Sequence, residues 1–145
     1  MARVIEDEEG IAEVVRGSRR IAVLGIKPES QRGQPAFYVP EYLKGAGLEV
    51  IPVPVYFPEL TEILGAKVYR KVTDVPGEID LVDVFRRPAD VALHTEELIA
   101  AKPKVVWMQL GIRNDEVAAK LVAAGIDVVM DRCLLVDHRR YAGSV

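Results

Sequence analysis

The sequence has very few of the residues that carry covalent or metal chemistry. It holds one cysteine, Cys133, and two histidines among 145 residues. A single cysteine excludes an internal disulfide and is typical of a reducing compartment. With so few sulfur and imidazole groups, a complete zinc site would need carboxylate ligands. We therefore predict no metal site.

Long hydrophobic runs and a strong charge imbalance are also missing. The residues before Arg20 are rich in charge and have no long apolar run, unlike a signal peptide, and no apolar segment reaches the length of a membrane span. The net charge is only -3, so no basic face of the kind that nucleic acid requires is expected. We predict a soluble, cytoplasmic protein that binds neither nucleic acid nor membrane, and a protein partner stays open.

Common catalytic and nucleotide-binding signatures are absent as well. The chain has no Gly-x-Ser-x-Gly elbow, no Gly-Lys-Ser/Thr phosphate loop and no His-Glu-x-x-His pair. The dinucleotide fingerprint needs glycine two and five residues after Gly25, where this chain has Lys27 and Ser30. We therefore assign no catalytic residue.

What is present is enough apolar sequence for a core and a regular alternation of elements. Half of the residues are hydrophobic, which predicts one domain over residues 1–145. Nine prolines beside a single asparagine resemble the composition of thermophile proteins. Strands are expected at 21–24, 48–53, 79–85, 104–109 and 126–130, and helices at 6–16, from about 35, at 58–64, 89–101, 115–124 and within 131–141. This order, without hairpin signals, predicts an α/β fold: a Rossmann-like three-layer domain with a five-stranded, mainly parallel sheet and helices on both faces.

Two helices carry signals at their ends or interior. Asp7 stands where it can cap the first helix. Pro40 falls inside the helix expected from Pro35, where it removes a backbone donor, so that helix should start late or kink.

The loop after the first strand is a candidate anion site. Gly25 and Gly33 bound the loop, and Lys27 and Arg32 lie within it. A strand, a glycine turn and a helix amino end together present free N–H groups and a favourable dipole to phosphate. The alternative is a plain strand end with solvated charges.

The ends of the later strands add candidates. Phe85, Arg86 and Arg87 follow the third strand, at the sheet edge where open α/β sheets bind ligands, and arginine pairs well with phosphate. Gln109 ends the fourth strand and is expected to approach the same site. The second strand ends in Val53 and Pro54 with no acid to hold a nicotinamide ribose, which disfavours NAD and suits an adenine.

Other residues that attract attention receive structural interpretations. Trp107 and Met108 on a central strand are expected in the core. Cys133 precedes His138 in the tail, a pattern that suggests a thiolate with a base, but a lone cysteine beside an apolar strand is more often a packed small hydrophobe. His94 is interpreted as a surface residue.

Six segments together resemble the small stand-alone CoA-binding proteins, which are similar to the amino-terminal domain of the succinyl-CoA synthetase alpha subunit. The segments are Ile-Ala-Val-Leu-Gly at 21–25, Val-Ile-Pro-Val at 50–53, Leu-Gly-Ala-Lys-Val-Tyr at 64–69, Asp-Leu-Val-Asp-Val-Phe-Arg-Arg at 80–87, Val-Trp-Met-Gln-Leu-Gly-Ile at 106–112 and Val-Val-Met-Asp-Arg-Cys at 128–133. They cover nearly the whole chain in order. The ligase's phosphorylated histidine belongs to a second domain that this sequence does not contain, so ligase activity is not implied.

The resemblance implies a Rossmann-like domain that holds coenzyme A. It places the phosphates near Gly25, Lys27 and Arg32, the adenine beside Val53 and Pro54, and Phe85 with Arg86 closing the site. Together with the strand-end residues, the predicted cofactor-binding set is Gly25, Ile26, Lys27, Ser30, Arg32, Gly33, Val53, Pro54, Phe85, Arg86, Arg87 and Gln109.

The expected function is non-catalytic binding of coenzyme A or an acyl-CoA through the loop after the first strand. A small enzyme that uses Cys133 on a thioester or a disulfide is the alternative, and an NAD(P)-binding sensor is a further one. Relatives commonly have a small residue and serine where this chain has Ile26 and Lys27, and Asn-Pro where it has Pro54 and Val55. These differences bear on ligand contacts more than on the fold.

Overall fold

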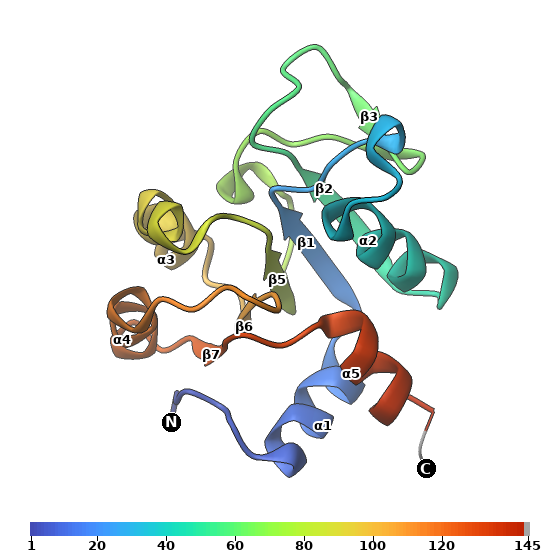
Figure 1. The fold of residues 1–145 in the computed structure, drawn as a ribbon. Helices are drawn as coiled ribbons and strands as arrows, with labels where there is room; N and C mark the ends of the chain where they lie inside the picture. The colour runs from blue at the N-terminus through green and yellow to red at the C-terminus, as the bar shows by residue number, and fades with distance from the viewer. Residues whose placement is uncertain (144–145) are drawn as a thin grey trace.

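The computed structural model describes residues 1–143 and contains a five-stranded parallel sheet in the order β2-β1-β5-β6-β7 (Figure 1). The strands are β1 Arg20–Leu24, β2 Glu49–Val53, β5 Leu81–Val84, β6 Val105–Met108 and β7 Asp127–Val129. Each neighbouring pair is parallel. The structure thereby confirms the predicted α/β fold class.

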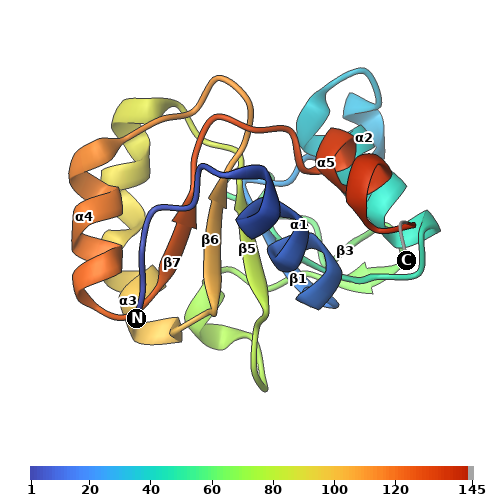
Figure 2. The same ribbon diagram turned by 90° about the horizontal axis from the view of Figure 1, so that it is seen from below.

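Helices cover both faces of this sheet. They are α1 Glu8–Gly17, α2 Pro35–Gly45, α3 Thr95–Ala101, α4 Asp115–Ala123 and α5 Leu134–Tyr141, with short 3-10 helices η1 Glu29–Gln31, η2 Val72–Asp74 and η3 Pro88–His94. In Figure 2, α1, α2 and α5 lie on one side and α3 and α4 on the other. Within residues 1–143, no helix has the length and apolarity needed to cross a bilayer.

Alternating residues of the strands form the two cores. Ile21 and Val23 of β1 pack into the core under α1, α2 and α5, whereas Ala22 and Leu24 pack into the core under α3 and α4. A strand buried on both faces has to be apolar throughout, which explains the continuous apolar run in the sequence. Trp107 and Met108 of β6 are fully buried on opposite faces, as predicted.

The order of the strands places a crevice between β1 and β5. The chain leaves β1 through α2 to reach β2 on one side, and β5 pairs with β1 on the other side. Connections that depart in opposite directions leave a gap above the carboxyl ends of the two strands, where doubly wound folds bind ligands.

The predicted late start of helix α2 at Pro40 is wrong, and a kink there stays a prediction. The helix begins at Pro35 and continues through Pro40 to Gly45. Because proline has no N–H, the carbonyl of Ala36, four residues earlier, has no partner inside the helix. That carbonyl instead accepts a hydrogen bond from the Lys27 N–H at 3.1 Å, so the proline contributes to fixing the loop that follows β1.

The predicted helix over 58–64 is wrong. The chain forms a hairpin there, with β3 Glu62–Ile63 antiparallel to β4 Ala66–Lys67. The two turn residues, Leu64 and Gly65, have φ of 54° and 72°, and positive φ at both central positions is the geometry of a two-residue hairpin turn. Gly65 therefore makes a turn and is not a helix cap, and the expectation of no hairpin was also wrong.

Two predicted helices have different boundaries in the structure. The segment expected as one helix at 89–101 consists of the 3-10 helix η3 followed by the α-helix α3. The last helix begins only at Leu134, so Arg132 and Cys133 lie in the connection that precedes it. The predicted cap of α1 is confirmed, because the Asp7 carboxylate accepts the Gly10 N–H at 2.9 Å.

One residue in the centre of the sheet breaks the apolar pattern. Asp83 of β5 is paired in register with Val23 and Trp107 and is 0% exposed. Neither carboxyl oxygen has a hydrogen-bond partner among the described residues. Burial in these surroundings disfavours the charged form and raises the pKa of Asp83 well above its usual value.

Candidate ligand-binding site

A cavity of about 510 Å³ opens at the crevice between β1 and β5. Its walls come from the loop after β1, the start of α2, and the segments that follow β2, β5, β6 and β7. The lining residues are Gly25, Lys27, Gln34, Pro35, Ala36, Tyr38, Tyr56, Phe85, Arg86, Arg87, Pro88, Gln109, Leu110, Gly111, Ile112 and Cys133. The volume falls within the range of small-molecule and cofactor sites.

Gly25 allows the chain to turn at the floor of this cavity. Its φ is +89°, and a Cβ built on it would lie 2.1 Å from the carbonyl oxygen of Phe85. Its N–H donates to the Val53 carbonyl at 2.8 Å. The loops after β1 and β5 therefore approach each other too closely for any side chain at this position.

The loop after β1 and the start of α2 make one wall. Lys27 and Ala36 both line the cavity. The backbone N–H of Ala36, in the first turn of α2, has no hydrogen-bond partner among residues 1–143. Free N–H groups at a helix amino end, with a lysine beside them, make a favourable environment for an anion.

Arg86 is held in the opposite wall by Tyr56 of the cavity lining and by His94 outside it. Its Nε donates to His94 Nε2 at 3.1 Å, and its guanidinium donates to the Tyr56 hydroxyl at 3.3 Å. Because His94 Nε2 accepts, the imidazole proton lies on Nδ1, which donates to the Glu97 carboxylate at 2.9 Å. His94 is only 14% exposed in its side chain, so its interpretation as a surface residue was wrong.

Glu97 anchors this chain of contacts. Burial raises its pKa, but hydrogen bonds from His94 and from the Val72 N–H outweigh burial, and the pKa of Glu97 lies below its usual value. An ionised Glu97 favours the tautomer of His94 that accepts from Arg86. Val72, Glu97 and His94 thus form a series of hydrogen bonds that fixes the Arg86 guanidinium at the cavity.

The loop that carries Tyr56 is fixed separately. Arg70 donates hydrogen bonds to the carbonyls of Tyr56, Phe57, Pro58 and Leu60 at 2.6 to 3.3 Å. A single guanidinium satisfies four carbonyls of an irregular loop and holds Tyr56 near Arg86, whose Cζ lies 5.8 Å from the Tyr56 ring centroid.

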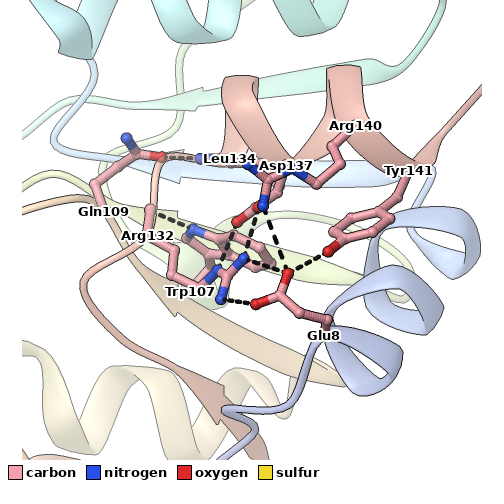
Figure 3. Close-up of polar contacts among 8 residues, drawn as sticks. All are labelled: Glu8, Trp107, Gln109, Arg132, Leu134, Asp137, Arg140 and Tyr141. Carbon is pink, nitrogen blue, oxygen red and sulfur yellow. Dashed lines mark hydrogen bonds and ion pairs between the residues drawn. The ribbon is translucent and has the colours of Figure 1, made fainter.

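The far wall is built around Arg132 (Figure 3). Its guanidinium pairs with Asp137 at 2.8 Å and with Glu8 of α1 at 2.9 Å. Hydrogen bonds from Arg132 and from Tyr141 lower the pKa of Glu8 to about 2. These contacts join α1 to α5 and fix the segment that holds Cys133.

Six of the predicted cofactor-binding residues line the cavity: Gly25, Lys27, Phe85, Arg86, Arg87 and Gln109. Arg87 is largely exposed and pairs with Asp90 at 2.8 Å. Gln109 comes from the end of β6, and its side chain is discussed below.

The other six predicted residues lie outside the cavity lining. Ile26, Val53 and Pro54 are buried, and Ser30 and Gly33 are exposed. Arg32 pairs with Glu41 at 3.3 Å and lies over the Phe37 ring. Ligand contact by these residues stays a prediction.

Several lining residues were not identified from the sequence as ligand contacts. Tyr38 and Tyr56 are exposed aromatics at the cavity, and Leu110 is 68% exposed beside them. Cys133 packs against the core under α5, as predicted, but also lines the cavity. The signal in the sequence for Tyr56 was an aromatic three residues after the end of β2, because the strand ends meet at this edge.

Comparison with known proteins gives the class of this domain. A family model described as a CoA binding domain matches residues 19–139. The chain therefore belongs to the CoA-binding domain family, and the resemblance carried by the six segments is confirmed.

Particular relatives agree with this assignment. The chain is 35% identical over 128 residues to an uncharacterized protein of Bacillus subtilis strain 168, YneT, covering 88% of this chain and 91% of YneT. The structure of cell-free ID.343 from Thermus thermophilus superposes with a TM-score of 0.84 at 36% identity, covering 94% and 99% of the two chains. A hypothetical protein from Pyrococcus horikoshii OT3 gives a TM-score of 0.83 at 34% identity, covering 99% of both chains.

A larger protein shares only the fold. The dinucleotide forming acetyl-coenzyme A synthetase 1 of Ca. Korarchaeum cryptofilum matches 81% of this chain with 27% of its own length, at 17% identity and a TM-score of 0.63. At this identity the similarity supports the Rossmann-like architecture alone.

Proposed function

We propose that this protein binds coenzyme A, or an acyl form of it, in the cavity between β1 and β5 and does not act as a catalyst on it. The observation that carries the proposal is the convergence of Lys27, Arg86 and Arg87 with the start of α2 on one cavity. Coenzyme A brings a pyrophosphate and a 3′-phosphate to such a site. The membership of the chain in a CoA-binding family supports the same ligand.

The surroundings of β2 support an adenine and disfavour a nicotinamide ribose. The strand ends in Val53 and Pro54, both buried, with no carboxylate to accept from ribose hydroxyls. A carboxylate at that position would also repel a phosphorylated ribose. An NAD(P) sensor is therefore the weaker candidate.

The lining of the cavity supports binding without catalysis. It includes no aspartate, glutamate or histidine among the described residues, and these are the usual general acids and bases. His94 is turned to Arg86 and Glu97 and is engaged at both ring nitrogens. A non-catalytic module of this kind acts as a carrier, a sensor or a subunit that presents coenzyme A.

A thermal-shift panel tests the proposal. We expect coenzyme A and acyl-CoAs to raise the melting temperature, because a ligand that binds the native state stabilises it by mass action. Dephospho-CoA should give a smaller shift, and NADH and ATP smaller ones still. The absence of a shift with every CoA species, or an equal shift with NADH, would contradict the proposed ligand.

Replacement of Lys27 by alanine should weaken CoA binding by about tenfold, because one charge-assisted contact to phosphate is lost. Isothermal titration calorimetry at low and high salt measures the effect, and the salt dependence of binding should also become shallower. Lys120→Ala is the matched control, because Lys120 lies on α4 and pairs there with Glu116. Equal affinity of Lys27→Ala and the wild type would place the phosphates elsewhere.

Replacement of His94 by leucine should weaken CoA binding by about tenfold, since the Arg86 guanidinium loses one charge-assisted hydrogen bond of about 1.5 kcal/mol that orients it. His94→Gln, whose side-chain oxygen can accept from Arg86, should restore part of the affinity. The control is His138→Leu, at the other histidine of the chain, which contacts Tyr42 on the α2 side. A loss of affinity in both leucine variants would indicate a general effect on stability and not on Arg86.

A further inference from the structure

Gln109 presents an unused hydrogen-bond donor to the cavity. The residue is 3% exposed and lines the cavity. Its Oε1 accepts the Leu134 N–H at 2.9 Å, which fixes the orientation of the amide. The NH2 group of Gln109 donates no hydrogen bond to residues 1–143. Figure 3 shows this nitrogen turned away from Leu134. This donor has no protein partner and faces the cavity, so an acceptor on a bound ligand can take its hydrogen bond.

Cys133 lies beside this donor and is fixed from both sides. The carbonyl of Arg132 accepts the Trp107 indole N–H at 2.8 Å, and the N–H of Leu134 is bound to Gln109. Cys133 is only partly buried and lines the same cavity as Gln109. The thiol is thus held at the cavity wall by contacts of its two neighbours.

The order of the strands gives the cavity a direction. Lys27 follows β1 and Arg86 follows β5, whereas Gln109 follows β6 and Cys133 follows β7. The Arg132 N–H donates to the Met108 carbonyl at 3.4 Å and the Leu134 N–H donates to Gln109. Cys133 therefore lies at the end of β6, about 4.8 Å in strand spacing from the end of β5 that carries Arg86. Phosphates bound at Lys27 and Arg86 would leave the rest of coenzyme A, an arm with two amides that ends in a thiol, to extend along the cavity towards Gln109 and Cys133.

We propose that Cys133 is the docking point for the thiol end of coenzyme A and forms a mixed disulfide with it. The Gln109 NH2 donates to the amide carbonyl nearest the ligand sulfur, which places that sulfur at Cys133. This inference rests on the proposed function. It assigns a covalent, reversible state to the same site.

The step is a thiol–disulfide exchange with the disulfide form of coenzyme A. The Cys133 thiol loses its proton, and its sulfur attacks one sulfur of the CoA disulfide. The S–S bond of the CoA disulfide breaks as the bond between Cys133 and CoA forms, and the departing CoA thiolate takes up a proton. One thiol and one disulfide are present before and after the step, so no further oxidant is required. Excess reduced coenzyme A reverses it.

Intact mass spectrometry of the reduced protein tests the inference. The chain has one cysteine, so one CoA per chain is the maximum adduct. We expect CoA disulfide to modify the native protein on the order of tenfold faster than glutathione disulfide at equal concentration, because binding raises the local concentration of the reacting sulfur. In denaturant the two disulfides should react alike. Adenosine 3′,5′-bisphosphate should slow only the native reaction with CoA disulfide.

Cys133→Ser separates this inference from the proposed function. The variant should form no adduct and keep the thermal shift caused by reduced coenzyme A. Equal rates with the two disulfides in the native protein, or no adduct with CoA disulfide, would overturn the role of Cys133 while a retained thermal shift leaves CoA binding intact. Loss of the thermal shift in the wild type would overturn both.

Discussion

Replacement of Gly25 by alanine should lower the free energy of unfolding by about 2–4 kcal/mol and remove CoA binding. Two effects act together. The φ of +89° is unfavourable for a residue with a Cβ, and that Cβ would meet the Phe85 carbonyl at 2.1 Å. Because the obstacle is backbone at the end of β5, relief requires the loops after β1 and β5 to separate. Urea denaturation measures the loss of stability, and calorimetry measures binding.

Gly33→Ala is the control for this variant in the same loop. A Cβ at Gly33 meets no atom within 4 Å, so its effect on stability should stay within about 0.5 kcal/mol. If Gly25→Ala were as stable as Gly33→Ala, the close approach of the two loops would be absent in solution, and the floor of the cavity would be wrong.

Asp83→Asn should stabilise the protein at neutral pH and have little effect near pH 4. The raised pKa of Asp83 means that the native state binds a proton that the unfolded chain releases above its ordinary pKa, near 4. The stability of the wild type therefore falls as pH rises from that value towards the native pKa, by up to about 1.4 kcal/mol per pH unit. Asparagine has nearly the same shape and does not ionise, so the stability advantage of the variant should grow as pH rises from about 4 towards 7.

Asp80→Asn, at the start of the same segment, should behave with the opposite sign. Partial burial raises the pKa of Asp80, but backbone N–H groups of Arg20 and Arg19 donate to its carboxylate and hold the pKa below its usual value. Its contribution to stability is present above the unfolded pKa and disappears as pH falls through the native pKa. In denaturation curves from pH 2 to pH 8, the advantage of Asp83→Asn should therefore grow as pH rises above about 4, whereas the deficit of Asp80→Asn should be constant above about pH 5 and shrink as pH falls below about 4. A constant difference across this range for Asp83→Asn would show that the carboxyl has a partner in solution.

The sheet could be predicted from the sequence because each of its strands is a short apolar run bounded by charge or glycine. Ile21 to Leu24 is such a run, and burial on both faces requires it. The hairpin at Leu64 and Gly65 was missed because a glycine after an apolar stretch also marks a helix end. Whether the chain forms a helix end or a hairpin turn here depends on the φ of Leu64. A positive φ is unfavourable for a bulky residue and is imposed here by the tertiary structure.

The candidate site was predictable in part for the same kind of reason. Strand-end residues such as Lys27 and Arg86 could be assigned to one edge, since parallel strands bring their carboxyl ends together. The residues that orient them could not, because His94 reaches Arg86 only through the turn of η3. The role of Asp83 could not be predicted either, because the sequence does not show whether an acid inside an apolar run has a hydrogen-bond partner in the fold.

The hydrogen bonds of Glu8 with Arg132 and Tyr141 have a consequence for the order in which the protein is completed during synthesis. Among the described elements, α1 leaves the ribosome first and α5 last, yet the wall that carries Cys133 depends on their joining. A nascent chain that has produced β1 to β6 already holds Lys27 and Arg86 but lacks this wall. The wall that carries Cys133 is therefore completed only when synthesis has passed Tyr141.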